Sequence, residues 1–318
     1  MGNRCCTDRK STSSSKVRDA CDGVDGKNPN LKHDQASKSI VAFDGQKPIR
    51  STSFQSRGDD ADKFDKAFEA NDIAGLVALL PSREAIWGIE EKMHPWAQDP
   101  QSVGALAGFQ LSAMAQIAVE EEDLQMNVSI GEAGAIVPFV DFLRSGEENR
   151  VQTAVVAFSH LLSDCPSNVR VAYEAGAMEL LMDQLEAHIA GMRYAAAKAL
   201  RDIFVESDAY RRRFVSLGGL TALIKQLSGM SDSEQWTSDH QRRAMVDSEE
   251  WTANRQFEAL LNLRDLLYDD SGNITRDYAL DAMTAGVERR LQAIMQTDDE
   301  EVRRTAAEML HGLSEVAK

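Results

Sequence analysis

The sequence has little of several features that define whole classes of protein. Aromatic residues make up 6% of the 318 residues, and there are only 7 Pro and 4 Cys. This composition excludes collagen-like and disulfide-scaffold proteins. The cysteines form no Cys-x-x-Cys pair, which favours a reducing compartment. No apolar run approaching the ~18 residues that cross a bilayer is expected. Residues 1–20 lack the apolar stretch of a secretory signal peptide, so we expect a protein that is not secreted.

The net charge of −16 is divided unevenly along the chain. Residues 1–57 carry a net charge of +5, whereas residues 58–318 carry −21. Because an acidic body repels nucleic acid, we expect no nucleic-acid partner. A basic tail on an acidic body fits a tail that lies near anionic lipid, although a tail that is merely soluble fits the charge equally well.

The amino terminus reads Met1-Gly2-Asn3-Arg4-Cys5-Cys6. Gly2 is the residue that N-myristoylation requires, and Cys6 stands where that motif prefers Ser or Thr. One myristoyl chain gives only marginal membrane binding, so stable anchoring needs a second signal, which S-palmitoyl groups on Cys5 and Cys6 would supply. The alternative is an incidental glycine followed by two ordinary thiols. We predict acylation at all three residues and therefore attachment to a membrane.

The chain after these cysteines is rich in Ser, Asp, Lys and Gly and has no apolar period up to residue 57. Such a composition is typical of disorder. We therefore divide the chain into a disordered acylated tether, residues 1–57, and a folded region, residues 58–318.

The folded region contains an internal repeat. Three segments align without a gap, and their glycines, Gly134, Gly176 and Gly218, are 42 residues apart. A fourth glycine, Gly286, follows after 68 residues. Each glycine is preceded by a short helical pattern and followed by two longer ones. A glycine at this position allows a sharp angle between the first helix and the second, since it tolerates a positive φ.

Three helices in about 40–47 residues resemble the armadillo repeat. We predict an all-α fold, a right-handed superhelical solenoid of about five to six armadillo repeats that acts as a monomer. Residues 62–96 are expected to form a helical cap. An insertion around residues 228–252 lengthens one repeat and contains Trp236 and Trp251. Insertions in repeats form loops on one face, so these tryptophans are possible partner contacts, and an incidental loop is the alternative.

Signatures of catalysis are missing from the sequence. The six His residues form no metal-binding spacing such as His-Glu-x-x-His, and there is no P-loop, Gly-x-Gly-x-x-Gly or Gly-x-Ser-x-Gly motif. We therefore expect no enzyme activity, no metal and no cofactor, and we expect protein partners instead.

The concave groove of such a solenoid is its usual binding surface. In nuclear-import armadillo proteins, ladders of Asn and Trp line that groove. The positions equivalent to Asn are here Gln116, His160, Asp202, Asn262 and Gly312. Those equivalent to Trp are Ser112, Val156, Lys198, Glu258 and Glu308. Only one Asn and no Trp remain, so import-cargo binding is not expected. Gln116, His160, Asp202 and Asn262 are predicted to line a polar groove that accepts a partner helix or extended segment.

An acylated amino terminus followed only by armadillo repeats resembles the armadillo-repeats-only proteins (ARO) of apicomplexan parasites. The residues that carry this resemblance are Gly2, Cys5, Cys6, Glu91–Ala97 and Val103–Leu106. It implies lipidation at Gly2, Cys5 and Cys6, a place on the cytosolic face of the rhoptry membrane and a role in positioning that organelle at the cell apex. It also implies a myosin motor, an ARO-interacting protein and an adenylate cyclase as partners. A vacuole-type acylated armadillo tether and a soluble scaffold without acylation remain alternatives.

Overall fold

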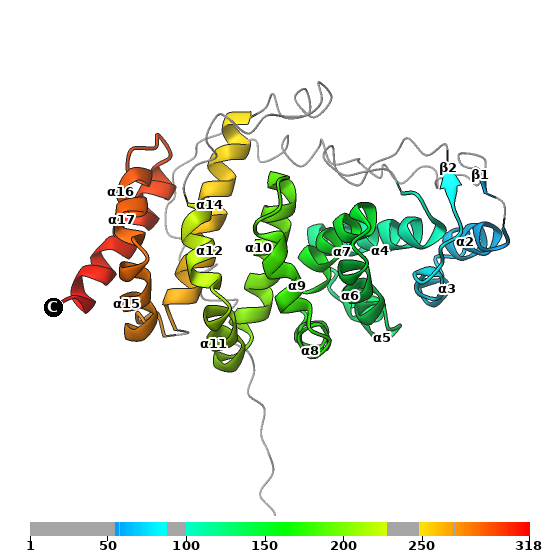
Figure 1. Ribbon diagram of the computed structural model, residues 1–318, viewed down its shortest axis with the longest axis horizontal. Coiled ribbons are helices and arrows are strands. Elements are labelled where there is room, and N and C mark those ends of the chain that lie inside the picture. Colours follow the sequence, from blue (N-terminus) through cyan, green and yellow to red (C-terminus); the bar gives the residue numbers. More distant parts are fainter. Residues whose placement is uncertain (1–54, 57, 88–99, 228–247, 270) are drawn as a thin grey trace, which may run out of the picture.

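The computed structural model describes residues 55–56, 58–87, 100–227, 248–269 and 271–318. In these residues the chain is almost entirely helical (Figure 1). The elements are, in chain order, β1 (Gln55–Ser56), α2 (Asp60–Glu69), α3 (Ile73–Leu79), β2 (Ile86–Trp87), α4 (Val103–Glu120), α5 (Gln125–Glu132), α6 (Ile136–Arg144), α7 (Glu148–Leu161), α8 (Pro166–Glu174), α9 (Ala177–Gln184), α10 (Ala190–Val205), α11 (Asp208–Ser216), α12 (Gly219–Gln226), α14 (Ser248–Leu267), α15 (Arg276–Thr284), α16 (Val287–Ile294) and α17 (Glu300–Val316).

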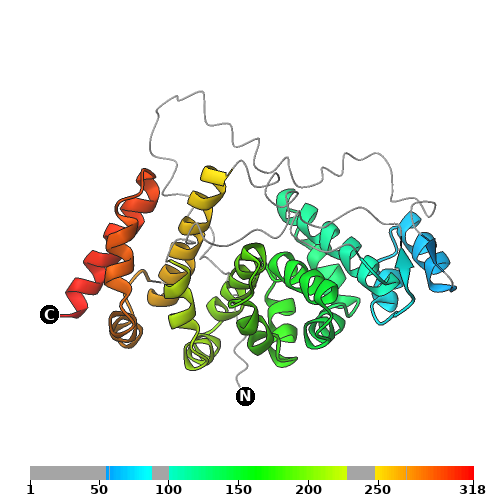
Figure 2. The same ribbon diagram turned by 45° about the horizontal axis from the view of Figure 1, so that its top comes forward.

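Most of these helices group into units of three, as the repeat predicts. The four complete units are α5–α7, α8–α10, α11–α14 and α15–α17, and α2–α4 form the unit before them. The units follow one another from α2 at one end of the molecule to α17 at the other (Figures 1 and 2). The all-α armadillo solenoid predicted from the sequence is therefore confirmed.

The aligned glycines have the backbone conformation that the sequence predicts. The φ angles are +90° at Gly134, +83° at Gly176, +86° at Gly218 and +82° at Gly286. These values lie in the left-handed region, which a side chain with a Cβ atom disfavours. The first turn of this kind lets α5 and α6 meet at an angle of 73°. The glycine spacing therefore marks where the chain turns from each first helix to the second.

The core runs without a break through all the units. Its largest fully buried side chains include Phe64, Phe139, Phe158, Phe204 and Phe214. Aromatic pairs connect consecutive helices, with Phe139 and Phe158 packed edge to face at 6.1 Å between ring centroids and Phe204 stacked on Phe214 at 4.8 Å. A single helix pair buries too little apolar surface to be stable, so each unit depends on its neighbours.

One helix differs from what the sequence analysis expects. In length and composition, α4 is apolar enough to cross a membrane, so the expectation that no such run exists is wrong. Most of this helix, 72%, is buried inside the solenoid, as is usual for a central helix of a globular protein. Its apolar character follows from this position, since α3 and α7 both pack on it.

Two short strands, β1 and β2, form a small antiparallel sheet that the all-α prediction does not include. Gln55 pairs with Trp87, and Ser56 pairs with Ile86. Two-residue strands leave no alternating pattern in a sequence, so this pairing has no detectable signal. The first strand of this sheet lies within residues 1–57, and it pairs the start of the described chain with the segment that follows α3.

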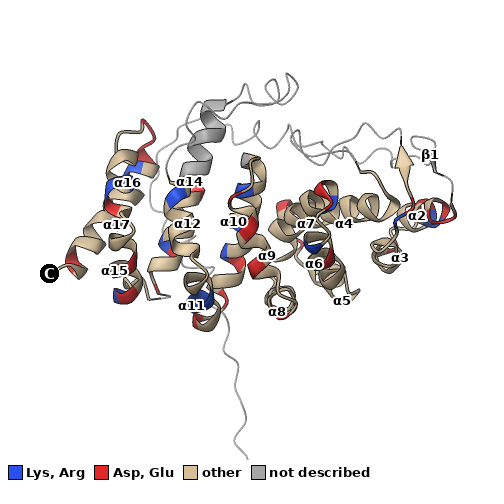
Figure 3. Ribbon diagram, in the orientation of Figure 1, with Lys and Arg blue, Asp and Glu red and all other residues tan. Residues whose placement is uncertain are grey.

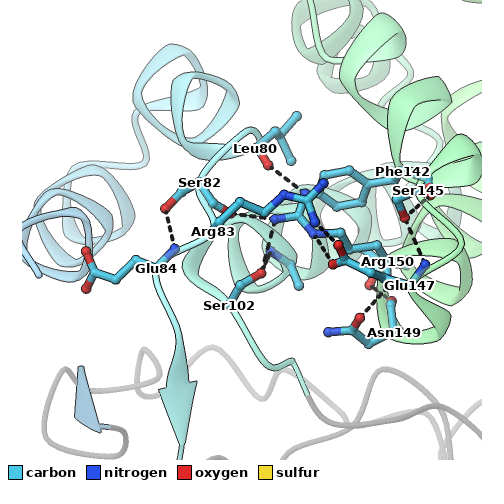
Figure 4. Close-up of polar contacts among 12 residues, drawn as sticks. Leu80, Ser82, Arg83, Glu84, Ser102, Phe142, Ser145, Glu147, Asn149 and Arg150 are labelled. Atoms are coloured by element: carbon cyan, nitrogen blue, oxygen red, sulfur yellow. Dashed lines mark hydrogen bonds and ion pairs between the residues drawn. The ribbon is translucent and has the colours of Figure 1, made fainter. Parts of the chain in front are cut away.

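A buried arginine joins the first unit to the repeats (Figure 4). The Arg150 side chain on α7 is 3% exposed, and its guanidinium donates to the backbone carbonyls of Leu80 and Ser82 and, at 3.3 Å, to the Ser102 hydroxyl. It also forms an ion pair with Glu147 at 3.1 Å. Burial and the nearby Arg83 lower the pKa of Arg150 to about 10, so it stays charged at neutral pH.

Gly104 allows this close approach. A Cβ atom at Gly104 would lie 2.4 Å from the Leu80 carbonyl oxygen and 2.5 Å from that of Ser82. No real Cβ atom is found so close to backbone oxygen. The start of α4 therefore touches the chain after α3 directly, and an Arg150 guanidinium nitrogen lies 3.0 Å from the same Cβ position.

Candidate partner-binding face

The third helices of the units form one row. In that row α4 contacts α7, α7 contacts α10, α10 contacts α14, and α14 contacts α17. On α10 the residues Tyr194, Lys198, Arg201, Asp202 and Val205 recur at helical spacing on one side. Tyr194 is 36% exposed and Val205 is 40% exposed, so this side of α10 faces solvent. Charges of both signs lie on it (Figure 3).

An ion pair connects this side of α10 to the next unit. The Nε atom of Arg201 donates to Oδ2 of Asp265 on α14 at 2.6 Å, and a second guanidinium nitrogen also pairs with that oxygen. Burial lowers the pKa of Arg201, but the charge and hydrogen bond of Asp265, together with other nearby carboxylates, outweigh this effect, so the pKa is raised overall. The charges of Asp202 and Glu258 act in the same direction. Three carboxylates thus act on Arg201, and Lys198 is a second cation near Asp202.

Asp202 connects α10 to the preceding unit. Its Oδ2 accepts a hydrogen bond of 3.2 Å from the hydroxyl of Ser163, just after α7. Burial raises the pKa of Asp202 to about 6, even though Lys198, Arg201 and the Ser163 hydrogen bond lower it. The nearby Asp164 raises it further. The carboxylate is therefore stabilised less by its surroundings than an exposed aspartate is by water.

The adjoining side of α14 presents acceptors. Glu258, Asn262 and Asp265 are spaced four and three residues apart, which places them on the same side of the helix as the ion pair with Arg201. Asn262 is 3% exposed, and its side-chain oxygen has no hydrogen-bond partner in the described part of the molecule. We name Asp202, Glu258, Asn262 and Asp265 the acceptor cluster.

The other predicted positions of the ladder are more varied. Gln116 on α4 is half-buried and donates to Glu120 at 2.9 Å. His160 on α7 is half-buried, and its backbone carbonyl accepts from the side chain of Asn127 at 3.0 Å. At Gly312 on α17 the space of a side chain is taken by Tyr268, whose hydroxyl would lie 2.4 Å from an added Cβ atom. Asp202 and Asn262 lie on the contacting helices α10 and α14, whereas Gln116 and His160 lie on α4 and α7, which come earlier in the row.

Several predicted site residues lie outside the described residues. These are Gly2, Cys5 and Cys6 of the acylation motif, Trp236 of the insertion, and Glu91–Ala97 of the resemblance to ARO, which fall within the undescribed residues 88–99. Trp251 falls within α14, which begins at Ser248, but its side chain is not among those described. The lipidation sites and the tryptophan contacts therefore stay predictions.

Asparagine side chains link consecutive units, which is not among the predictions from the sequence. Asn168 donates to the carbonyls of Asn127 and Leu161, both at 2.9 Å, and Asn127 donates in turn to His160. The two asparagines hold the third position of their short helices, α8 and α5, so their recurrence in the repeat was a usable signal. The roles of Ser163 and Asp265 had no such signal.

Two hollows in the described part lie away from the acceptor cluster. One, of about 680 Å³, is bordered by α2 and α3, and the other, of about 390 Å³, lies beside Arg83 and Glu147. No predicted ladder residue borders either of them. Among the residues that the structure describes, no group of three or more His, Cys, Asp or Glu side chains is placed to hold a metal ion.

Comparison with solved structures identifies the fold. The ARO protein from Plasmodium falciparum matches with a TM-score of 0.68 and 29% sequence identity over 81% of this chain and 99% of that chain. The resemblance to ARO is confirmed. No protein-family model matches the sequence, and no curated protein matches it.

More distant structures support the fold alone. A designed armadillo repeat protein in complex with the peptide (KR)4 matches with a TM-score of 0.53 and 20% identity, over 81% of this chain and 87% of that one. A chain from a study of the interaction between cadherin and beta-catenin matches with a TM-score of 0.57 and 16% identity, over 81% of this chain and 42% of that one. The armadillo-repeat fold is of a scaffold type that binds other proteins.

Proposed function

We propose that this chain is a membrane-anchored adaptor. Acyl chains on Gly2, Cys5 and Cys6 hold it on the cytosolic face of an organelle, and the solenoid recruits partners to that surface. The observation that carries the proposal is the likeness to ARO along 99% of that protein's chain, together with the Gly2 and Cys5-Cys6 motif of this sequence.

The organelle of this proposal is the rhoptry, and the role is its placement at the cell apex. A myosin motor, an ARO-interacting protein and an adenylate cyclase are the partners that the resemblance suggests. The row of third helices supports such recruitment, since it offers a long surface of mixed charge with Tyr194 and Val205 exposed. The length of that surface allows more than one partner to bind.

Fractionation of cells that express full-length variants tests the anchor. The parent protein should sediment with membranes, and Gly2→Ala should move it to the soluble fraction because palmitoylation depends on prior membrane contact. Cys5→Ala with Cys6→Ala should leave only marginal binding through one myristoyl chain. Cys21→Ala serves as the control and should sediment as the parent does. If both acylation variants sediment like the parent, the anchor is wrong.

The soluble Gly2→Ala protein also separates anchoring from recognition. In pull-downs from cytosol it should retain the protein partners of the parent, because the solenoid is unchanged. Loss of every partner would place recognition in the tail or at the membrane and would contradict the adaptor role of the solenoid. Rhoptry location is checked by imaging the tagged full-length protein, and a vacuolar signal would favour the tether instead.

A further inference from the structure

We propose that the hollow between α2 and α3 binds the zwitterionic headgroup of a membrane phospholipid, with its phosphate at Lys63 and Lys66 and its ammonium group at Asp72. This inference rests on the proposed membrane anchor, since the anchor brings headgroups within reach. It is carried by the size of the hollow, by the charges that border it and by its place beside the start of the described chain.

The hollow is large enough for a headgroup and is partly apolar. Its volume of about 680 Å³ lies in the range of small-molecule sites in proteins. A Cβ atom at Gly75 would lie 2.9 Å from the Cβ atom of Ala67 and 2.6 Å from Oδ2 of Asp72, so a side chain here would crowd both helices. The small and apolar lining residues are Ala67, Gly75, Ala78, Leu79 and Pro81.

The charged lining groups are two carboxylates, Asp60 and Asp72, and two ammonium groups, Lys63 and Lys66. Charges of both signs are visible on α2 (Figure 3). Asp60 is already engaged, because it accepts from Lys63 at 2.6 Å and from the Ser82 hydroxyl at 2.8 Å. The Lys66 side chain has no hydrogen bond or ion pair within the described residues. Lys66 and two of the three N–H donors of Lys63 are therefore left for a phosphate.

Asp72 supplies the opposite charge. Its Oδ1 caps α3 by accepting from the Gly75 amide at 3.0 Å, and the side chain is otherwise exposed. A zwitterionic headgroup carries one phosphate and one ammonium group, so it can be bound by the lysines and by Asp72 at the same time. An anionic headgroup lacks this match, and the net charge of −21 on residues 58–318 repels it.

The hollow lies at the end of the solenoid where residues 1–54 join the described chain. β1, β2, α2 and α3 lie together at the end opposite α17 (Figure 1). Asp60, which borders the hollow, follows Ser56 by four residues, and these span at most about 14 Å. A tethered site meets its ligand at a raised effective concentration, so weak affinity for a single headgroup is sufficient.

The test is a titration of purified full-length protein with glycerophosphocholine, the headgroup without its acyl chains, followed by saturation-transfer difference NMR. The parent should bind it. Lys63→Gln with Lys66→Gln should weaken binding about tenfold, since the change removes the charge-assisted contacts with the phosphate.

Asp72→Asn separates the two halves of the headgroup. Asn caps a helix as well as Asp does, so α3 should be unchanged. Binding of glycerophosphocholine should weaken about threefold, whereas binding of glycerol 3-phosphate, which has no ammonium group, should not weaken. An equal loss for both ligands would contradict the role of Asp72.

The control variant carries Arg289→Gln with Arg290→Gln. Both residues are exposed on α16, in the last unit, and the change removes the same two charges as the lysine pair. Its binding should stay within twofold of the parent. Circular dichroism should show the same helix content for all variants, which excludes unfolding as the cause.

A second measurement distinguishes a bilayer headgroup from a free phosphodiester. Full-length protein that carries an N-myristoyl group is mixed with phosphatidylcholine vesicles at about 2 mM lipid, which is enough for one myristoyl chain to hold most of it. Amides of α2 and α3 should exchange more slowly with vesicles than without them, and those of α15–α17 should be unchanged.

Three results would overturn the headgroup site. The first is binding of glycerophosphocholine by the lysine variant at the parent's affinity, and the second is an equal loss in the arginine control. The third is exchange in α2 and α3 that vesicles do not slow. Failure of the anchor is seen separately, because the titration uses no membrane, and the lysine variant should still sediment with membranes as the parent does.

Discussion

Asp202 combines two effects that act in opposite directions. Burial raises its pKa to about 6 from an ordinary value of 3.8, whereas Lys198, Arg201 and the hydrogen bond from Ser163 lower it. The raised pKa means that the folded chain holds the Asp202 proton more tightly than the unfolded chain does. The contribution to stability is therefore complete below pH 3.8 and is lost as the pH rises through about 6.

Replacement of Asp202 by Asn should consequently stabilise the protein at neutral pH. The shift from 3.8 to about 6 sets an upper limit, and solvent near the half-buried side chain reduces it, so we expect about 1–2 kcal/mol at pH 7.5. The amide oxygen of Asn can still accept from Ser163. Urea unfolding at a series of pH values checks this, and the difference between variant and parent should shrink to zero near pH 4.

Parallel stability curves for Asp202→Asn and the parent between pH 4 and 7.5 would contradict this account of Asp202. A variant less stable than the parent at pH 7.5 would contradict it as well.

Among the elements, the joint between the first unit and the repeats depends on one side chain. Arg150 on α7 supplies donors to the Leu80 and Ser82 carbonyls and pairs with Glu147. Arg150→Met keeps an unbranched stem that can stay buried but removes the guanidinium, with its donors and its charge. This change leaves the buried Leu80 carbonyl and the partly buried Ser82 carbonyl without this donor and should cost about 2–4 kcal/mol.

Hydrogen exchange measured by mass spectrometry locates the effect of Arg150→Met. Amides of α2 and α3 should exchange faster, while those of α15–α17 should be unchanged, because each unit contacts only its neighbours. Arg304→Met on α17 is the matched control, since Arg304 is 68% exposed, and it should change stability by less than about 0.5 kcal/mol. Equal protection of α2 and α3 in Arg150→Met and the parent would show that the joint does not depend on Arg150.

The sequence predicts the elements better than it predicts their connections. The spacing of Gly134, Gly176 and Gly218 fixes three turns, since each needs a positive φ that glycine alone adopts readily. The pairs Arg201–Asp265 and Ser163–Asp202 join residues 64 and 39 positions apart, and their formation depends on how the units stack and on side-chain rotamers. Nothing in the sequence distinguishes an arginine that becomes buried, such as Arg150, from one that stays exposed. The apolar run of α4 was likewise missed because Gln and Ser interrupt it.

At the scale of the whole molecule, the proposed function assigns different roles to residues 1–57 and to the solenoid. In the proposed adaptor the solenoid provides the row of third helices for partners, and the net charge of −21 on residues 58–318 disfavours contact with anionic lipid. The proposed attachment to a membrane therefore rests on the amino terminus, where a basic tail and the predicted acylation sites Gly2, Cys5 and Cys6 lie together. This division predicts that membrane binding and partner binding can be abolished independently.

The most direct test of the anchored adaptor is the intact mass of the protein isolated from its own cells. We predict loss of Met1, a fourteen-carbon acyl group on Gly2 and sixteen-carbon thioesters on Cys5 and Cys6 that hydroxylamine removes. A mass equal to that of the unmodified chain, with neither adduct present, would contradict the account and leave a soluble armadillo scaffold.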